Sequence, residues 1–271
     1  MESMLKFQQW IKTGKSIIAV VAPVSERNNI FQELYILAKG DLKLPIYQWN
    51  LGEPKDFAEV EVSQNYNYEP YVTSRKRLDI SISAGATPGD MAIAALKYFQ
   101  SDFTQGILII ENISDCLLQN EGLIIKQLLI NIHSELSKKQ GNKHLILLLQ
   151  NESDLPSSII NLINILELKL PTYLEAEYII LTDLTAFSDQ KISKQTLEQL
   201  TSAALGLHIE DIKAGLRQSL EQPLMLVSSM LQYKINHFKS FNLNFVPKPD
   251  IYNFGGLENW LSRALRAKIL K

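Results

Sequence analysis

The stretch Gly106-Ile107-Leu108-Ile109-Ile110-Glu111-Asn112 decides the fold class of this chain. Four consecutive large aliphatic residues stand between a glycine and a polar pair. A strand that is apolar at every position, instead of at alternate ones, is typical of a parallel sheet that helices cover on both faces. The stretch therefore predicts a central parallel strand with Glu111 at its carboxyl end. Ligands and metals collect at that edge in open α/β sheets, so Glu111 is a candidate site residue.

Further apolar runs predict four more strands, separated by segments with helical periodicity. These runs span residues 16–22, 45–49, 144–149 and 165–170. Strands that alternate with helices form βαβ units with parallel pairing, and so residues 1–171 are predicted to form a three-layer α/β sandwich. The helix expected over residues 121–139 would present one apolar side to the sheet, made of Leu123, Ile124, Leu128, Ile132 and Leu136.

Residues 53–85 depart from this alternation, because they are polar and lack a clear period. We expect a long irregular insertion here, with a hairpin around residues 78–83 as an option. Tyr66 and Tyr68 stand near the basic triplet 75–77, which contains Arg75 and Arg77, and aromatic and basic side chains together can bind single-stranded nucleic acid. A solvated surface insertion is the simpler interpretation, and we prefer it.

Beyond Pro171 the periodicity is entirely helical. The expected helices span residues 172–184, 194–204, 209–220 and 224–238. They predict a small helical domain over residues 172–240, followed by a linker and a C-terminal amphipathic helix over residues 241–271. The apolar side of that last helix would contain Trp260, Leu261, Leu265 and Ile269.

The composition is that of an ordinary globular protein, with 46% hydrophobic residues and a net charge of −2. This balance gives no overall field that favours nucleic acid or an anionic membrane. A single cysteine, Cys116, and four scattered histidines form no zinc motif and fit a reducing compartment. No apolar run reaches the roughly 20 residues of a membrane-spanning helix. We therefore expect a cytoplasmic protein.

Two segments invite comparison with a phosphate-binding loop. Such a loop follows a strand and opens a helix, so that backbone N–H groups and the helix N-terminus hold the phosphates. The triplet Gly14-Lys15-Ser16 precedes a strand instead, and Gln9 stands where the motif needs a glycine. The turn at residues 22–29 has the right position after the first strand, but it contains neither glycine nor lysine, and Glu26 would repel phosphate.

Polar residues at strand ends offer the remaining site candidates. Glu111 ends a strand that resembles a Walker B strand, in which an acid orients magnesium and water. Asn151 follows the strand at 144–149, where a polar sensor residue would contact a γ-phosphate. Apolar strands often end in polar residues without any function, and an acid and an amide cannot hydrolyse ATP without a loop that holds the phosphates. Cys116 has no histidine nearby in the sequence, so we do not assign it as a nucleophile.

Several segments together resemble a known family. They are residues 16–23, Tyr47-Gln48-Trp49, Leu108-Ile109-Ile110-Glu111-Asn112, residues 166–172, Ala203-Ala204-Leu205-Gly206-Leu207 and residues 251–258 with Gly255-Gly256-Leu257. In this order they are similar to the amino-terminal half of the conserved AAA-type ATPases of cyanobacteria and algal plastids. The resemblance extends over nearly the whole chain.

This resemblance implies an AAA-like, P-loop-NTPase-like sheet domain with a degenerate phosphate loop, followed by a helical lid. It places Arg217 near the position at which an AAA lid carries a second sensor residue. It also implies a cytoplasmic location, or the plastid stroma for a plastid-encoded protein. In the family a catalytic ATPase module follows the Gly-Gly-Leu segment, whereas this sequence ends at Lys271. The expectation is therefore a lone amino-terminal module, or a paralogue without the motor.

The sequence favours a non-catalytic role over an enzyme. We expect an AAA-like module that binds a protein partner, such as a homologous AAA ATPase or a second copy of itself. No catalytic residue, metal ligand or cofactor is assigned; Glu111, Asn151 and Arg217 are the candidates for an ATP and Mg²⁺ site. The alternatives are a weak, atypical ATPase that uses these residues, and a nucleic-acid adaptor that uses the 65–77 segment.

Overall fold

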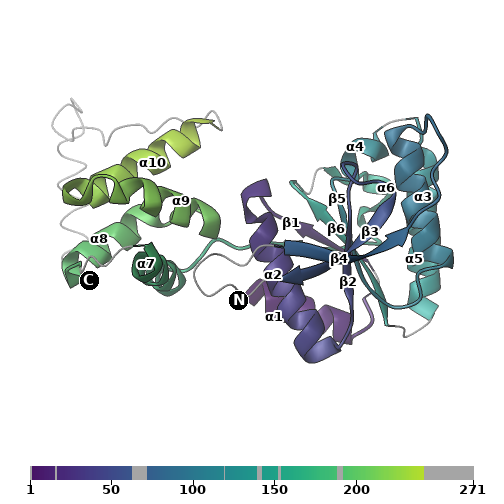
Figure 1. Cartoon of the computed structure of the whole chain (residues 1–271), viewed down its shortest axis with the longest axis horizontal. Coiled ribbons are helices and arrows are strands. Elements are labelled where there is room, and N and C mark those ends of the chain that lie inside the picture. The colour runs from purple at the N-terminus through teal and green to yellow at the C-terminus, as the bar shows by residue number, and fades with distance from the viewer. Residues whose placement is uncertain are drawn as a thin grey trace, which may run out of the picture.

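The computed structural model of the chain forms a sheet domain and a helical bundle that a single extended segment connects (Figure 1). It describes residues 2–15, 17–62, 72–118, 120–138, 142–151, 154–187 and 192–240. Within these residues, the sheet contains seven strands in the order β4-β3-β2-β5-β6-β1-β7. The strands are β1 (Ile17–Val21), β2 (Ile46–Trp49), β3 (Asp56–Val62), β4 (Val72–Asp79), β5 (Gly106–Glu111), β6 (Lys143–Leu149) and β7 (Asn164–Glu167).

The predicted central strand is β5, which has three strands on either side of it. It pairs in parallel with β2 and β6, and every one of its residues is buried. Strand β1 pairs in parallel with β6 and β7. The α/β class with a mostly parallel sheet is thus confirmed.

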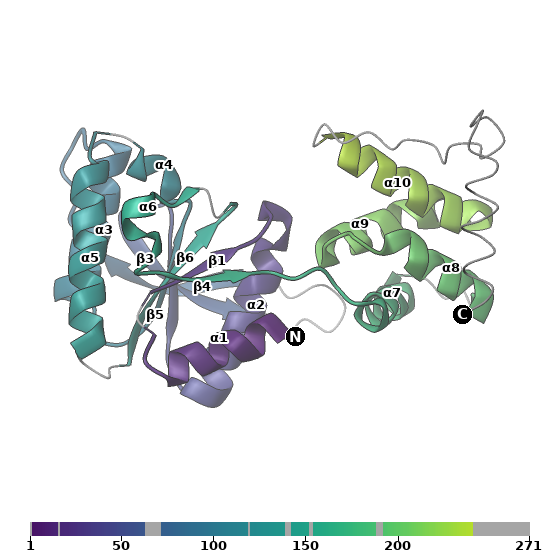
Figure 2. The ribbon, with the colours of Figure 1, turned by 180° about the vertical axis from the view of Figure 1, so that it is seen from behind.

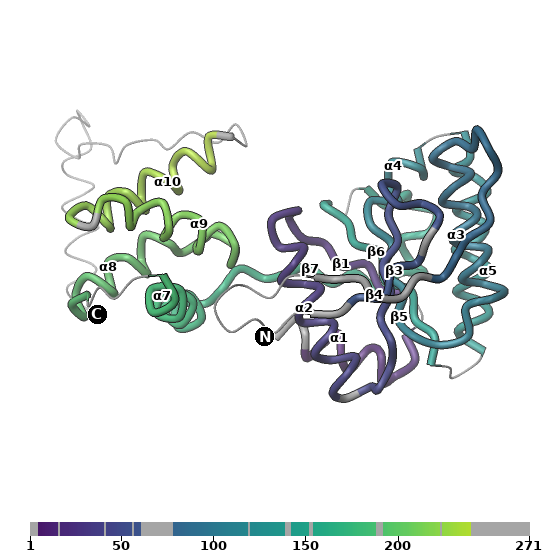
Figure 3. The backbone as a smooth tube through the Cα atoms, viewed as in Figure 1, coloured from purple at the N-terminus to yellow at the C-terminus, as the bar shows by residue number. Residues whose placement is uncertain are grey.

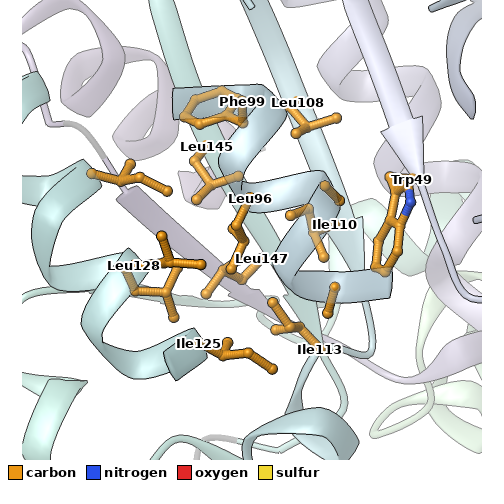
Figure 4. Packing of buried hydrophobic residues seen from close by; sticks show 14 of the residues in the cluster. Trp49, Leu96, Phe99, Leu108, Ile110, Ile113, Ile125, Leu128, Leu145 and Leu147 are labelled. Atoms are coloured by element: carbon orange, nitrogen blue, oxygen red, sulfur yellow. The ribbon is translucent and has the colours of Figure 1, made fainter. Parts of the chain in front are cut away.

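Helices cover both faces of the sheet, as the wholly apolar strands require. One layer contains α1 (Glu2–Lys12) and α2 (Arg27–Leu37), and the other contains α3 (Pro88–Ser101) and α5 (Gly122–Lys138) (Figures 1 and 2). Successive side chains of a strand point to opposite faces. Ile107 and Ile109 therefore pack toward α1 and α2, while Leu108 and Ile110 pack toward α3 and α5. Figure 4 shows the second of these cores, where Leu108 and Ile110 meet Leu96.

The predicted apolar side of α5 is right at Leu128, Ile132 and Leu136 and wrong at Leu123 and Ile124. Ile125, Leu128, Leu129 and Ile132 are buried, whereas Leu123 and Ile124 are 77% and 52% exposed. The helix begins at Gly122, where an added Cβ would lie 2.2 Å from the carbonyl oxygen of Leu117. Ile125, Leu128, Leu129 and Ile132 follow the i, i+3, i+4, i+7 spacing of one helix face, and Leu123 and Ile124 fall outside it.

The expectation of an irregular segment at residues 53–85 is wrong for much of its length. Strands β3 and β4 form an antiparallel pair that extends the sheet beyond β2. Tertiary pairing overrides the polar composition here, because a few apolar residues anchor the hairpin to both cores. Phe57 packs in the core beside α3 and α5, and Val60 packs in the core beside α1 and α2. The optional hairpin at residues 78–83 is also misplaced, since β4 ends at Asp79.

The helical bundle follows β7 and contains, among the described residues, α7 (Tyr173–Phe187), α8 (Lys194–Ala204), α9 (Ile209–Leu220) and α10 (Leu226–Ser240). Its core is made of residues from all four helices, including Ile180, Leu200, Leu216 and Met230. Short helical segments are also present among the described residues. They are η1 (Val24–Glu26), η2 (Ala38–Leu42), α4 (Ser114–Leu117), α6 (Ser157–Ile160) and η4 (Pro223–Met225). Figure 3 shows the path of the backbone through both parts.

Candidate functional site

A pocket of about 430 Å³ lies at the carboxyl ends of the central strands. The residues after β1, β2 and β5 line it together with the end of β6. Strand register determines which side chains meet there. Asn50 follows Trp49, which pairs with Ile110, so Asn50 lies beside Glu111. Gln48 and Glu111 both point toward the α2 layer, because their neighbours Trp49 and Ile110 pack on the α3 and α5 layer.

Arg27, the first residue of α2, pairs with Glu111 in this pocket. Its Nε donates to one carboxylate oxygen of Glu111 at 2.5 Å, and its Nη2 donates to the other at 2.9 Å. Nη2 also donates to the side-chain oxygen of Gln48 at 3.1 Å, and Asn50 donates to Glu111 at 3.3 Å. Both oxygens of the carboxylate are thus bound, in the two-pronged geometry that arginine forms with carboxylates. Arg27 also lies over the ring of Phe31, with 4.7 Å from its Cζ to the ring centroid.

This pairing is the functional feature that the sequence analysis missed. The sequence makes Glu111 a candidate magnesium ligand, whereas its partner in the structure is the guanidinium of Arg27, from the turn that would hold phosphates in a nucleotide-binding protein. Gln48 was the available signal, since it is a polar residue between Tyr47 and Trp49 on the face that Glu111 shares. Among the described residues that line the pocket, Arg27 is the only lysine or arginine.

Glu26, next to Arg27, is fully buried and links the sheet domain to the bundle. Its Oε1 accepts a hydrogen bond from the backbone N–H of Glu210 at 2.8 Å, in the first turn of α9. Asn29 donates to its other oxygen at 3.0 Å. The residue at the N-cap of α9, His208, makes no side-chain cap. A carboxylate of the turn after β1 therefore occupies the N-terminus of a helix, which is a favourable site for an anion.

Burial raises the pKa of Glu26, and the nearby charges of Glu210 and Asp211 raise it further, while the hydrogen bonds from Glu210 and Asn29 lower it. Burial dominates, because a charged carboxylate loses its hydration when the bundle covers it.

Asn151 lies outside the Glu111 pocket. It lines a second cleft of about 800 Å³ between the sheet edge and the bundle, together with His208, Asp211 and His237. Its backbone N–H donates to the side chain of Asp154 at 3.0 Å. His237 lies 3.7 Å from Asp211, and burial lowers the pKa of His208. None of the described residues that line this cleft is a lysine or an arginine.

Arg217 points into the bundle. It pairs with Asp183 of α7 through two hydrogen bonds of 2.9 and 3.2 Å, and its Cζ lies 4.3 Å from the centroid of the Phe187 ring. The structure thus places the three sequence candidates apart, with Glu111 in the first pocket, Asn151 in the second cleft and Arg217 between α9 and α7.

Of the other candidates, only Cys116 has a described side chain, and it lines neither pocket. Cys116 is buried, and its pKa is raised by burial and by the charges of Asp115 and Glu121. Tyr66 and Tyr68 lie outside the described residues, as do the side chains of Arg75 and Arg77 and the whole of the predicted C-terminal helix. In the part of the chain that the structure describes, no group of three or more His, Cys, Asp or Glu side chains is placed to hold a metal ion. No helix in that part is long and apolar enough to span a membrane.

Comparisons with known proteins agree on the fold. The chain aligns with the crystal structure of the FIGL-1 AAA domain over 97% of this chain and 87% of that one, with a TM-score of 0.55 and 11% identity. The chain has the fold of an AAA-type ATPase domain. A second match is the Escherichia coli MS115-1 HORMA:CdnC:Trip13 complex, at a TM-score of 0.53 and 12% identity, with 90% of this chain and 83% of that one covered. A third is Trip13 from Rhizobiales, at a TM-score of 0.51 and 12% identity over 80% and 73% of the two chains.

Sequence comparisons add no relative. No protein-family model matches the chain, and no curated protein matches it. With identities of 11–12%, the structural matches show the fold and leave the chemistry to be argued from the residues of this chain.

Proposed function

We propose that this chain is a non-catalytic AAA-type module that acts by binding a protein partner and holds no nucleotide. The Arg27–Glu111 pair carries the proposal. In an ATPase of this fold, an acid at this position would orient magnesium. Here a guanidinium of the same chain satisfies both carboxylate oxygens at 2.5 and 2.9 Å, so that a fixed organic cation stands in place of the metal.

The phosphate-loop turn supports the same proposal. ATP needs several cationic or N–H donors around its β- and γ-phosphates. The turn at residues 22–29 has no lysine and no glycine, and its one arginine is engaged by Glu111 and Gln48. The adjacent Glu26 places a carboxylate at the N-terminus of α9, where it would compete with a phosphate. The residues of this turn, including Glu26, thus oppose the binding of a nucleotide phosphate.

We infer that a module without a nucleotide acts by binding a protein partner. One of the structural neighbours is an AAA protein in a complex with other proteins, HORMA and CdnC. We propose that this chain likewise joins a protein assembly, either with a homologous ATPase or with further copies of itself.

Thermal unfolding with Mg-ATP tests the proposal. A ligand at a hundred times its dissociation constant stabilises a protein by about 2.7 kcal/mol, which raises the melting temperature by several degrees. We expect millimolar Mg-ATP and Mg-ADP to leave the midpoint unchanged, in wild type and in Glu111→Gln alike. A rise in wild type that Glu111→Gln removes would contradict the proposal and show that nucleotide binds at Glu111, as the atypical ATP-binding alternative requires.

A second experiment addresses the partner. Cross-linking in the native host, followed by mass spectrometry of the purified chain, should identify links to an AAA ATPase or between two copies of this chain. Links confined to nucleic-acid-binding proteins, lost after nuclease treatment, would favour the adaptor alternative.

A further inference from the structure

Helix α7 is apolar on two separate faces, of which the bundle covers one. Ala176, Ile180 and Leu184 are buried in the bundle core against α8 and α9. A helix that packs on one side only normally has a polar outer face. The second apolar face of α7 therefore needs an explanation.

The outer face consists of Leu174, Tyr178 and Leu181, which follow one another at the i, i+4, i+7 spacing of a single helix face. Their side chains are 73%, 70% and 42% exposed. We refer to these three residues as the α7 stripe. A contiguous stripe of large apolar side chains on a surface is typical of a docking site, whereas single exposed apolar residues are common.

The charges near the α7 stripe indicate what kind of segment would bind to it. Helix α7 carries Glu175 and Glu177 near the stripe and no lysine or arginine, and its third acid, Asp183, is buried and paired with Arg217. The segment 257–271 of the same chain has the opposite character, because it has four basic residues and a single acidic one, Glu258. The basic residues are Arg263, Arg266, Lys268 and Lys271.

The hydrophobic pattern of that segment also matches. Its apolar residues recur at helical spacing, as the face of an amphipathic helix that lies in a groove requires. They are Leu257, Trp260, Leu261, Ala264, Leu265 and Ile269. An apolar face with a basic surround is complementary to the α7 stripe with its acidic surround.

The connection to the bundle permits this contact. The segment follows α10, which ends at Ser240 in the same bundle as α7. Residues 241–256 between them can span up to about 50 Å when extended, and α7 is only about 22 Å long. A tether of this length gives an effective concentration in the millimolar range, so even weak affinity suffices for an intramolecular contact.

We propose that the segment 257–271 folds back as a basic amphipathic helix onto the α7 stripe of its own chain. The bundle then presents a covered α7 to any partner, and release of the segment exposes an apolar, acidic surface. This contact is independent of whether the sheet domain binds nucleotide.

Cross-linking of cysteine pairs in the full chain tests the proposal. The native Cys116 is buried and is replaced by alanine in all variants. One variant carries Leu181→Cys with Ala264→Cys. The matched control carries Leu123→Cys with Ala264→Cys. Leu123 is 77% exposed, against 42% for Leu181, so accessibility alone favours the control, but it lies on α5, on the far side of the sheet domain (Figure 1). The protein is kept at about 1 μM, below the concentration at which weak dimers form, and a short bis-maleimide cross-linker is added.

We expect the α7 pair to form an intramolecular product about tenfold faster than the control pair. Adding Leu174→Glu and Tyr178→Glu should reduce the rate to that of the control, and raising the salt to about 1 M should lower it through screening of the charges. Circular dichroism checks that these surface variants remain folded. Equal rates for both pairs would overturn the proposal. Cross-linked dimers whose yield rises with protein concentration would also overturn it, because the occupant would then be a second copy.

Discussion

Replacing Arg27 by methionine provides the sharpest test of the Arg27–Glu111 pair. Methionine retains much of the apolar stem over Phe31 but removes the guanidinium. Glu111 is only 7% exposed and would lose the cation that binds both of its oxygens. Breaking a fully buried pair in this way costs about 3–5 kcal/mol. Because the Arg27 side chain is 33% exposed, solvent screens the pair, and we expect about 2–3 kcal/mol.

Urea unfolding, followed by tryptophan fluorescence, measures this cost. Trp49 is buried beside the site and reports on the sheet domain. With a slope of about 2–3 kcal/mol per molar urea, the midpoint should fall by about 1 M. The matched control is Lys39→Met, since the Lys39–Glu59 pair is longer, at 3.7 Å, and more exposed, and should cost under about 1 kcal/mol.

A double-mutant cycle separates the pair from its surroundings. Arg27→Met combined with Glu111→Leu should recover most of the lost stability, because an apolar pair leaves no buried charge unsatisfied. In Arg27→Met alone, about 10 mM Mg²⁺ should restore part of the stability by replacing the missing cation, whereas wild type should not respond. Additive single effects, or a loss no larger than that of Lys39→Met, would refute the view that Arg27 stands in place of a metal.

Three further predictions concern other positions. Because burial raises the pKa of Glu26, its contribution to stability is fully present below its ordinary pKa and is lost as pH rises through the raised value. Urea unfolding at a series of pH values should therefore show Glu26→Gln gaining stability relative to wild type toward neutral pH. Plots of unfolding free energy against pH that run parallel for the two proteins would contradict the raised pKa. Gly215→Ala should destabilise the bundle by about 1–3 kcal/mol, since the added Cβ would lie 2.7 Å from Met230 and Tyr233, whereas Gly40→Ala, with no atom within 4 Å, should not; circular dichroism melting compares the two. Cys116 should react with a thiol reagent only as fast as the sheet domain opens, because the thiol is buried and its pKa is raised.

The sequence alone was sufficient for the parallel core. Wholly apolar runs such as Ile107–Ile110 need cover on both faces, and that requirement fixes the layered architecture before any contact is known. Composition was misleading for the polar segment that contains β3 and β4. This segment is part of the sheet because it pairs with β2 and because Phe57 and Val60 anchor it in the two cores on opposite faces.

The sequence also identified Glu111 as the end of the central strand, and it recognised that the turn at residues 22–29 lacks the residues of a phosphate loop. It could not pair Glu111 with Arg27, because these residues are 84 positions apart and meet only when β5 lies beneath the start of α2. The link from Glu26 to the N-terminus of α9 spans 184 positions and depends on how the bundle sits against the sheet. Local patterns determine which elements form and which faces they bury. The partner of each buried charge is decided by tertiary structure, because the hydrogen bonds that satisfy it come from distant parts of the chain.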